Sequence, residues 1–181
     1  YLMIHQQDPV GLITFDEKIR DVIPPKSKRT QLGTILGHLA SLKPTGPTEI
    51  AACLTQVAAM FRHRSLVMVF SDLLAEPGPV FQALRRLRHR GHDVILFHVL
   101  DEAEVNFPYD GMIEFEDPES GEKLTVDASS YRRDYKSEID GFRELFKKEC
   151  FQTGVDYVPL DTSMQFDKAL LGYLISRQQR G

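Results

Sequence analysis

Four aspartates each follow an apolar run, at the point where a predicted strand ends. They are Asp16, Asp72, Asp101 and Asp161. Parallel strands finish at the same edge of a sheet, and open α/β sheets bind their ligands at that carboxyl edge. Carboxylate oxygens gathered there are typical ligands of a divalent cation such as Mg²⁺. The pattern indicates either a cation site or ordinary turns, because aspartate also opens turns and caps helices.

Asp72 differs from the other three aspartates in its surroundings. Asp16 begins a hairpin turn and Asp161 precedes a capping-box pattern, whereas a loop separates Asp72 from the next predicted helix and leaves its carboxylate without an obvious cap. Thr48 is its expected partner. With Pro47 at the first helical position, the Thr48 hydroxyl is available to face the sheet edge. A hydroxyl, a carboxylate and water suit Mg²⁺ or Mn²⁺, although two protein ligands alone bind weakly.

Alternating strands and helices must position these residues. Apolar, β-branched runs predict buried strands at 10–15, 65–71, 94–100 and 155–160. Helical spacing of apolar residues predicts helices at 28–42, 47–62, 79–90 and 129–152, and another after the capping-box pattern at 162–165. Such alternation requires parallel pairing through right-handed crossovers. The sequence predicts an α/β fold: a doubly wound, mostly parallel sheet with helices on both faces.

Two segments depart from this alternation. The run at 19–23 follows 10–15 after a short turn and meets Pro24 and Pro25, which predicts a hairpin whose second strand ends at the prolines. Two short runs on either side of 117–122 predict a β-ribbon inserted at 105–127. The 181 residues contain no clear linker, so we expect residues 1–181 to form a single domain.

Composition and motifs exclude several classes of function. The formal charge of −4 argues against a dedicated nucleic-acid binder and against contact with a membrane surface. No apolar stretch approaches the roughly 20 residues of a spanning helix.

The arginine-rich tracts at 62–64 and 85–90 are expected to be solvated helix ends, and Cys53 and Cys150 to be buried thiols. No hydrolase or Walker motif occurs, and His98 in its apolar strand is expected to be a hydrogen-bonded core residue, so we predict no enzyme.

The runs VGLITFD, TGPTEI and VMVFSDL, in that order on an α/β pattern, resemble the von Willebrand factor A-like domain. More closely, they resemble the bacterial "domain of unknown function" 58 family, which has that fold. The resemblance implies a metal-ion-dependent adhesion site in which Thr48 is the second element and Asp72 the third. The first element, a D-x-S-x-S loop, is absent from this chain. We therefore expect a remnant site that binds no cation tightly here, with Mg²⁺ or Mn²⁺ held in the complete protein.

The same resemblance has a consequence for the sheet. It implies that the family's first strand precedes Tyr1, so that the domain is N-terminally truncated. That strand would lie centrally, between the strands predicted at 10–15 and 65–71. Unpaired backbone groups are costly, so we expect the chain to close this gap, or a neighbouring molecule to fill it by strand exchange in a homo-oligomer.

The resemblance also implies a function. It points to a cytoplasmic, non-enzymatic protein-interaction module that works with a MoxR-type AAA+ ATPase in assembling or remodelling complexes, an inference by analogy. The alternative is a Mg²⁺-dependent phosphohydrolase or phosphoacceptor domain that uses Asp72 together with Asp16 or Asp101. This alternative fits the carboxylates at the sheet edge but has no nucleophile paired with a base.

Overall fold

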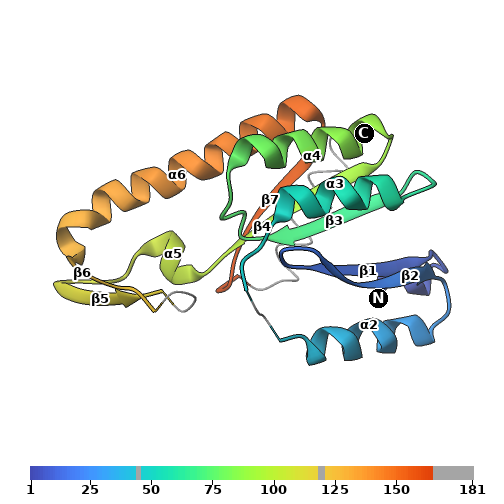
Figure 1. Ribbon diagram of the computed structural model, residues 1–181, viewed down its shortest axis with the longest axis horizontal. Coiled ribbons are helices and arrows are strands. Elements are labelled where there is room, and N and C mark those ends of the chain that lie inside the picture. The colour runs from blue at the N-terminus through green and yellow to red at the C-terminus, as the bar shows by residue number, and fades with distance from the viewer. Residues whose placement is uncertain (44–45, 118–120, 165–181) are drawn as a thin grey trace.

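A parallel sheet forms the centre of the chain in the computed structural model, which describes residues 1–43, 46–117 and 121–164. Its strands are β3 (Leu66–Ser71), β4 (Asp93–Leu100) and β7 (Asp156–Asp161), hydrogen-bonded in the order β3-β4-β7. Helices α3 (Ile50–Met60), α4 (Pro77–His89) and α6 (Ala128–Thr153) lie along one side of this sheet (Figure 1). The α/β class and the parallel pairing predicted from the sequence are confirmed.

The main core lies between the sheet and these three helices. Strand β4 has a partner on each side, and its residues 94–98 are all buried. Strand β3 has a partner on one side within the described residues, and it alternates buried Val67 and Val69 with exposed neighbours. From the helices, Leu84 and Phe146 reach this core with 1% and 0% of their surface exposed. Burial of such apolar side chains is the main force that holds the layers together.

A separate antiparallel hairpin consists of β1 (Val10–Phe15) and β2 (Ile19–Lys26), and the helix α2 (Thr30–Ser41) follows it. The hairpin is confirmed, but β2 does not stop before Pro24. It continues through both prolines to Lys26, because an edge strand tolerates residues without an N–H. Gly11 is required at this point, since a Cβ there would lie 2.6 Å from the Ile23 carbonyl oxygen.

Strands β1 and β3 belong to different sheets, and no ladder joins them within the described residues. The described residues of the chain therefore do not close the gap between them. The prediction that β1 is buried on both faces is wrong, because Gly11 is exposed and the other residues of the strand are partly exposed. Phe15 nevertheless packs against the main core. A strand supplied by a neighbouring molecule stays a prediction.

The two strands of the predicted ribbon form an antiparallel pair. They are β5 (Met112–Glu116) and β6 (Lys123–Asp127), and with the preceding short helix α5 (Glu102–Asn106) they project beside the beginning of α6 (Figure 1). Phe107, which is 5% exposed, packs its ring 4.6 Å from that of Tyr135 in α6. These rings hold the ribbon against the helix.

The helices differ from prediction mainly at their ends. Helix α6 matches the expected range closely and ends at Gly154, and a short helix, α1 (Leu2–His5), opens the chain. Helix α3 begins at Ile50 with Glu49 as its N-cap, so the placement of Pro47 at the first helical position is wrong. No helix in the described ranges is both long and apolar enough to cross a membrane. The final helix predicted after 162–165 lies outside the described residues.

Candidate functional site

The loop that follows β3 presents Asp72 at the carboxyl edge of the parallel sheet. The side chain of Ser71 accepts a hydrogen bond from the Leu73 N–H at 3.0 Å, and the Asp72 carboxylate accepts one from the Leu74 N–H at 3.3 Å. The expectation that the Asp72 carboxylate has no obvious backbone group to cap is therefore wrong. Leu73 has a φ of 60° and a side chain that is 0% exposed, whereas the neighbouring Leu74 is 65% exposed. A leucine in this left-handed region is strained, so its burial must hold the turn in place.

The buried side chain of His98 supports the loop that contains Asp72. The Nε2 atom of His98 lies 2.9 Å from the backbone oxygen of Asp72, and its Nδ1 atom lies 2.7 Å from the Tyr157 hydroxyl. Because a carbonyl oxygen can only accept, Nε2 carries the proton and Nδ1 accepts from Tyr157. His98 is 1% exposed, which confirms its expected place in the core. The strands β3, β4 and β7 are thus linked through one side-chain network.

The electrostatics of this network keep it neutral. Burial lowers the pKa of His98, and the positive charge of Arg143 lowers it further, against an opposing effect of the hydrogen bond to Asp72. Burial raises the pKa of Tyr157 to about 12, against the opposing effect of Arg143. His98 is therefore a neutral hydrogen-bond bridge at neutral pH, and its role is to position the Asp72 backbone.

Thr48 lies in the exposed loop that precedes α3. The next residue, Glu49, donates its backbone N–H to the Asp16 carbonyl at 3.0 Å, which ties the start of α3 to the end of β1. Ile50 and Leu73, which flank the two candidate residues, belong to the same buried cluster. Figure 1 draws the beginning of α3 toward the end at which β3 finishes. Thr48 and Asp72 share no hydrogen bond in the described structure, and their joint action stays a prediction.

The other aspartates serve local structure. Asp16 accepts from the Lys18 N–H and pairs with Arg20; burial raises the pKa of Asp16, but these hydrogen bonds outweigh it and hold the pKa below its ordinary value. Asp101 caps α5 in a capping box with Glu104. Asp161 accepts from the backbone and hydroxyl of Ser163. The turn roles expected for Asp16 and Asp161 are confirmed, whereas the helix that Asp161 was expected to precede lies outside the described residues.

This arrangement bears on the cation expected at the sheet edge. No group of three or more His, Cys, Asp or Glu side chains suited to a metal ion occurs among the described residues. Thr48 and Asp72 offer one hydroxyl and one carboxylate, which is fewer than the protein oxygens of a tightly bound Mg²⁺ site. By themselves these residues do not fit a resident cation.

The supporting network could not be found from spacing alone. His98 stood out as a polar residue inside an apolar strand, but its two partners lie 26 and 59 residues away in the sequence. The two cysteines are buried free thiols, as expected, and burial raises the pKa of Cys150 to about 12, so it is not a reactive thiolate at neutral pH.

Two solved structures share this fold. One is the conserved hypothetical protein BatB from Bacteroides thetaiotaomicron, with a TM-score of 0.58 and 18% identity over 99% of this chain and 84% of that chain. The other is an aerotolerance-related membrane protein from Bacteroides fragilis NCTC 9343 with multiple mutations to serines, with a TM-score of 0.56 and 17% identity over 97% of this chain and 86% of that chain. No curated protein matches. The family described as "Protein of unknown function DUF58" matches residues 1–144, and this chain belongs to that family.

Proposed function

We propose that this chain is a non-enzymatic protein-interaction domain that presents the loop 72–74 to a protein partner. The observation that carries the proposal is a contrast within the loop. Asp72 and Leu74 are exposed, whereas the backbone is held by buried Leu73 and by the hydrogen bond from buried His98. A loop that is already ordered loses little conformational entropy when it binds, so exposed apolar and acidic side chains on it favour association.

The local bonding of the carboxylates argues against catalysis in place of binding. Asp16 is paired with Arg20, and Asp101 is engaged in capping α5. Neither is therefore available to act with Asp72 as a second carboxylate without breaking these bonds. Both ring nitrogens of His98 are already engaged, Nε2 with the Asp72 carbonyl and Nδ1 with the Tyr157 hydroxyl.

The class of partner comes from the family resemblance. We infer a MoxR-type AAA+ ATPase as the partner, in the assembly or remodelling of complexes in the cytoplasm, with no nucleic-acid or membrane contact by this segment. The net charge of −4 supports the inference that this segment contacts neither nucleic acid nor a membrane. Thr48 would contact the same partner. Mg²⁺ or Mn²⁺ would join this site in the complete protein only with ligands beyond Thr48 and Asp72.

Binding to the MoxR-type ATPase of the same organism tests this proposal. The chain is immobilised and the ATPase is titrated over it by biolayer interferometry. Leu74→Ala and Asp72→Asn should each weaken binding by about tenfold or more, the size expected of a central contact residue. Leu124→Ala is the matched control, because Leu124 is 62% exposed against 65% for Leu74 but lies in the inserted ribbon.

Two outcomes would overturn the proposal. One is binding that both loop substitutions leave unchanged, or an absence of binding at about 100 µM ATPase, which corresponds to a free energy weaker than about −5.5 kcal/mol. The other is Mg²⁺-dependent hydrolysis of phosphate esters that Asp72→Asn abolishes. That result would favour the phosphohydrolase alternative.

A further inference from the structure

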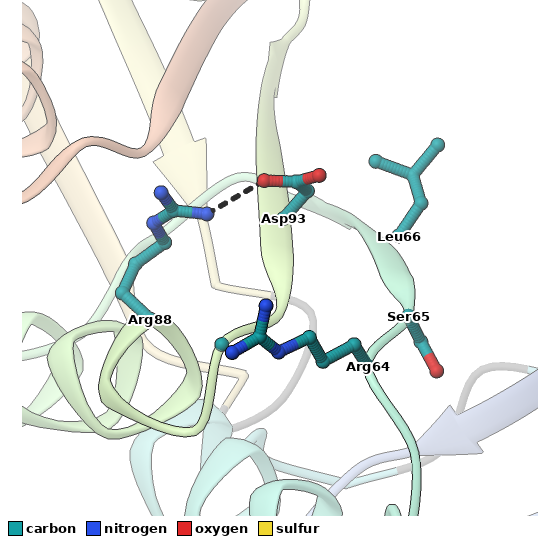
Figure 2. A pocket seen from close by; sticks show the side chains of 6 residues that line it. Arg64, Ser65, Leu66, Arg88 and Asp93 are labelled. Carbon is teal, nitrogen blue, oxygen red and sulfur yellow. Dashed lines mark hydrogen bonds and ion pairs between the residues drawn. The ribbon is translucent and has the colours of Figure 1, made fainter.

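Two basic tracts that are separate in the sequence meet at the amino end of the parallel sheet. Residues 62–64 follow α3 and lead into β3, and residues 86–90 end α4 and lead into β4. Arg64 and Arg88, one from each tract, line the same open pocket of about 500 Å³ together with Asp93 and Leu66 (Figure 2). The sequence predicted that each tract is a solvated helix end, but it did not predict that the two tracts lie together.

The two arginines in the pocket have different roles. Arg88 donates to the His92 carbonyl at 2.6 Å and to the Asp93 carboxylate at 2.9 Å, so it is held in place. Arg64 makes no ion pair with any described residue, and it lies across Gly91, where an added Cβ would be 2.9 Å from its Nε atom. Gly91 has a φ of +84° and leaves the room that Arg64 occupies. The pocket thus contains one fixed and one available guanidinium group.

Helix dipoles do not account for all of this charge. The two tracts carry five arginines: Arg62, Arg64, Arg86, Arg88 and Arg90. Asp93 and Asp156, which begin β4 and β7 at this end of the sheet, supply two negative charges, and the carboxyl ends of α3 and α4 each supply about half of one. A net positive charge of about two remains. This end of the molecule therefore favours an acidic ligand.

The opposite end of the molecule is strongly acidic. The described residues 101–117 and 121–127, which include α5, β5 and β6, contain nine acidic side chains and one basic side chain, Lys123, which pairs with Glu114 and Glu116. Arg132 of α6 pairs with Asp110. Apolar side chains accompany the acidic ones, with Met112 71% exposed and Leu124 62% exposed. The basic pocket likewise includes an apolar residue, Leu66, which is 40% exposed.

These two surfaces cannot meet within one chain. Strand β4 begins with Asp93 at the basic pocket and ends just before Asp101, and its eight residues span roughly 25 Å. Figure 1 shows the ribbon and the end of α4 at opposite ends of the long axis. We infer that the basic surface of residues 62–64 and 86–90 binds the acidic surface formed by α5, β5 and β6 of a second copy of this chain, head to tail. A contact between two different surfaces is not closed, so it builds open chains of molecules.

Charge reversal with complementation tests this inference. In about 50 mM salt, sedimentation velocity should show a mass that rises with protein concentration, and about 500 mM salt should remove that rise by screening. Arg64→Glu with Arg90→Glu, or Glu114→Lys with Glu116→Lys, should each leave a monomer. A mixture of the two variants should form a one-to-one dimer, because each retains the surface that the other lacks. Thermal unfolding of every variant confirms that it is folded.

The matched control reverses the same number of charges elsewhere. Lys26→Glu with Lys28→Glu changes the net charge as the arginine pair does, at the exposed end of β2 and just after it, and should leave self-association unchanged. A monomer at about 200 µM in low salt, or association that either charge-reversed pair retains, would overturn the inference. Salt-dependent binding of a DNA duplex of about 20 base pairs by a monomeric chain would make nucleic acid the occupant and also overturn it.

Discussion

Replacing His98 with Phe should destabilise the fold far more than its single position suggests. The Asp72 carbonyl loses the Nε2 donor at 2.9 Å, and the Tyr157 hydroxyl loses the Nδ1 acceptor at 2.7 Å and keeps its hydrogen bond to Arg143. A buried polar group left without a partner costs about 1–3 kcal/mol. The Phe ring fills similar space in a site that is 1% exposed, so the packing loss is small. The free energy of unfolding should fall by about 2–5 kcal/mol.

Urea unfolding of a double-mutant cycle measures this effect. Tyr157→Phe removes the hydrogen bonds of the hydroxyl to His98 and Arg143 and should cost about 1–2 kcal/mol. Combining it with His98→Phe should reveal a coupling of about 0.5–3 kcal/mol between the two side chains. Tyr109→Phe is the matched control, because Tyr109 lies in the exposed ribbon at 37% exposure, and should change stability by less than about 0.5 kcal/mol. A loss below about 1 kcal/mol for His98→Phe would refute the idea that His98 supports the Asp72 loop.

Three further predictions concern stability. Burial lowers the pKa of both His92 and His98, so below about pH 6.5 the unfolded chain binds protons that the folded chain does not. The free energy of unfolding should therefore fall there by up to about 1.4 kcal/mol per pH unit for each histidine. Urea titrations at several pH values measure this fall. Phe146→Ala, at a site 0% exposed, should cost about 3–5 kcal/mol in the same assay, whereas Phe151→Ala, at 82% exposure, should cost under about 0.5. Gln31→Leu should cost about 1–3 kcal/mol, because its side chain donates to two backbone carbonyls. Stability independent of pH between 7.5 and 5.5, or variants within error of the parent chain, would contradict these assignments.

The parts of the fold that the sequence predicted are those in which local pattern and tertiary packing agree. The stripe of apolar residues along α6 and the left-handed glycine at 154 both predict one long helix, and the structure contains it at 128–153. Helix α2 shows the opposite case. Its apolar spacing predicted a buried face, yet Leu36 and Leu39 are 55% and 44% exposed, and the buried residue of the helix is Gln31. Periodicity identifies a helix, but it does not show whether another element covers its apolar side.

The limits of prediction at the candidate site have a related physical cause. Sequence reasoning placed Asp72 correctly at the carboxyl edge, because a residue that follows a parallel strand must lie there. It did not predict that a buried histidine of the next strand and a tyrosine of the last strand fix the backbone of that loop, since such hydrogen bonds depend on the register between strands. Ser71 pairs with His98, and His98 pairs with Pro159 on the other side. A shift of one residue in either ladder would turn His98 to the opposite face of the sheet and leave the loop without its support. The rigidity of the Asp72 loop is therefore a property of the assembled sheet, and substitutions within the ladders should alter binding through the loop even where they contact no partner.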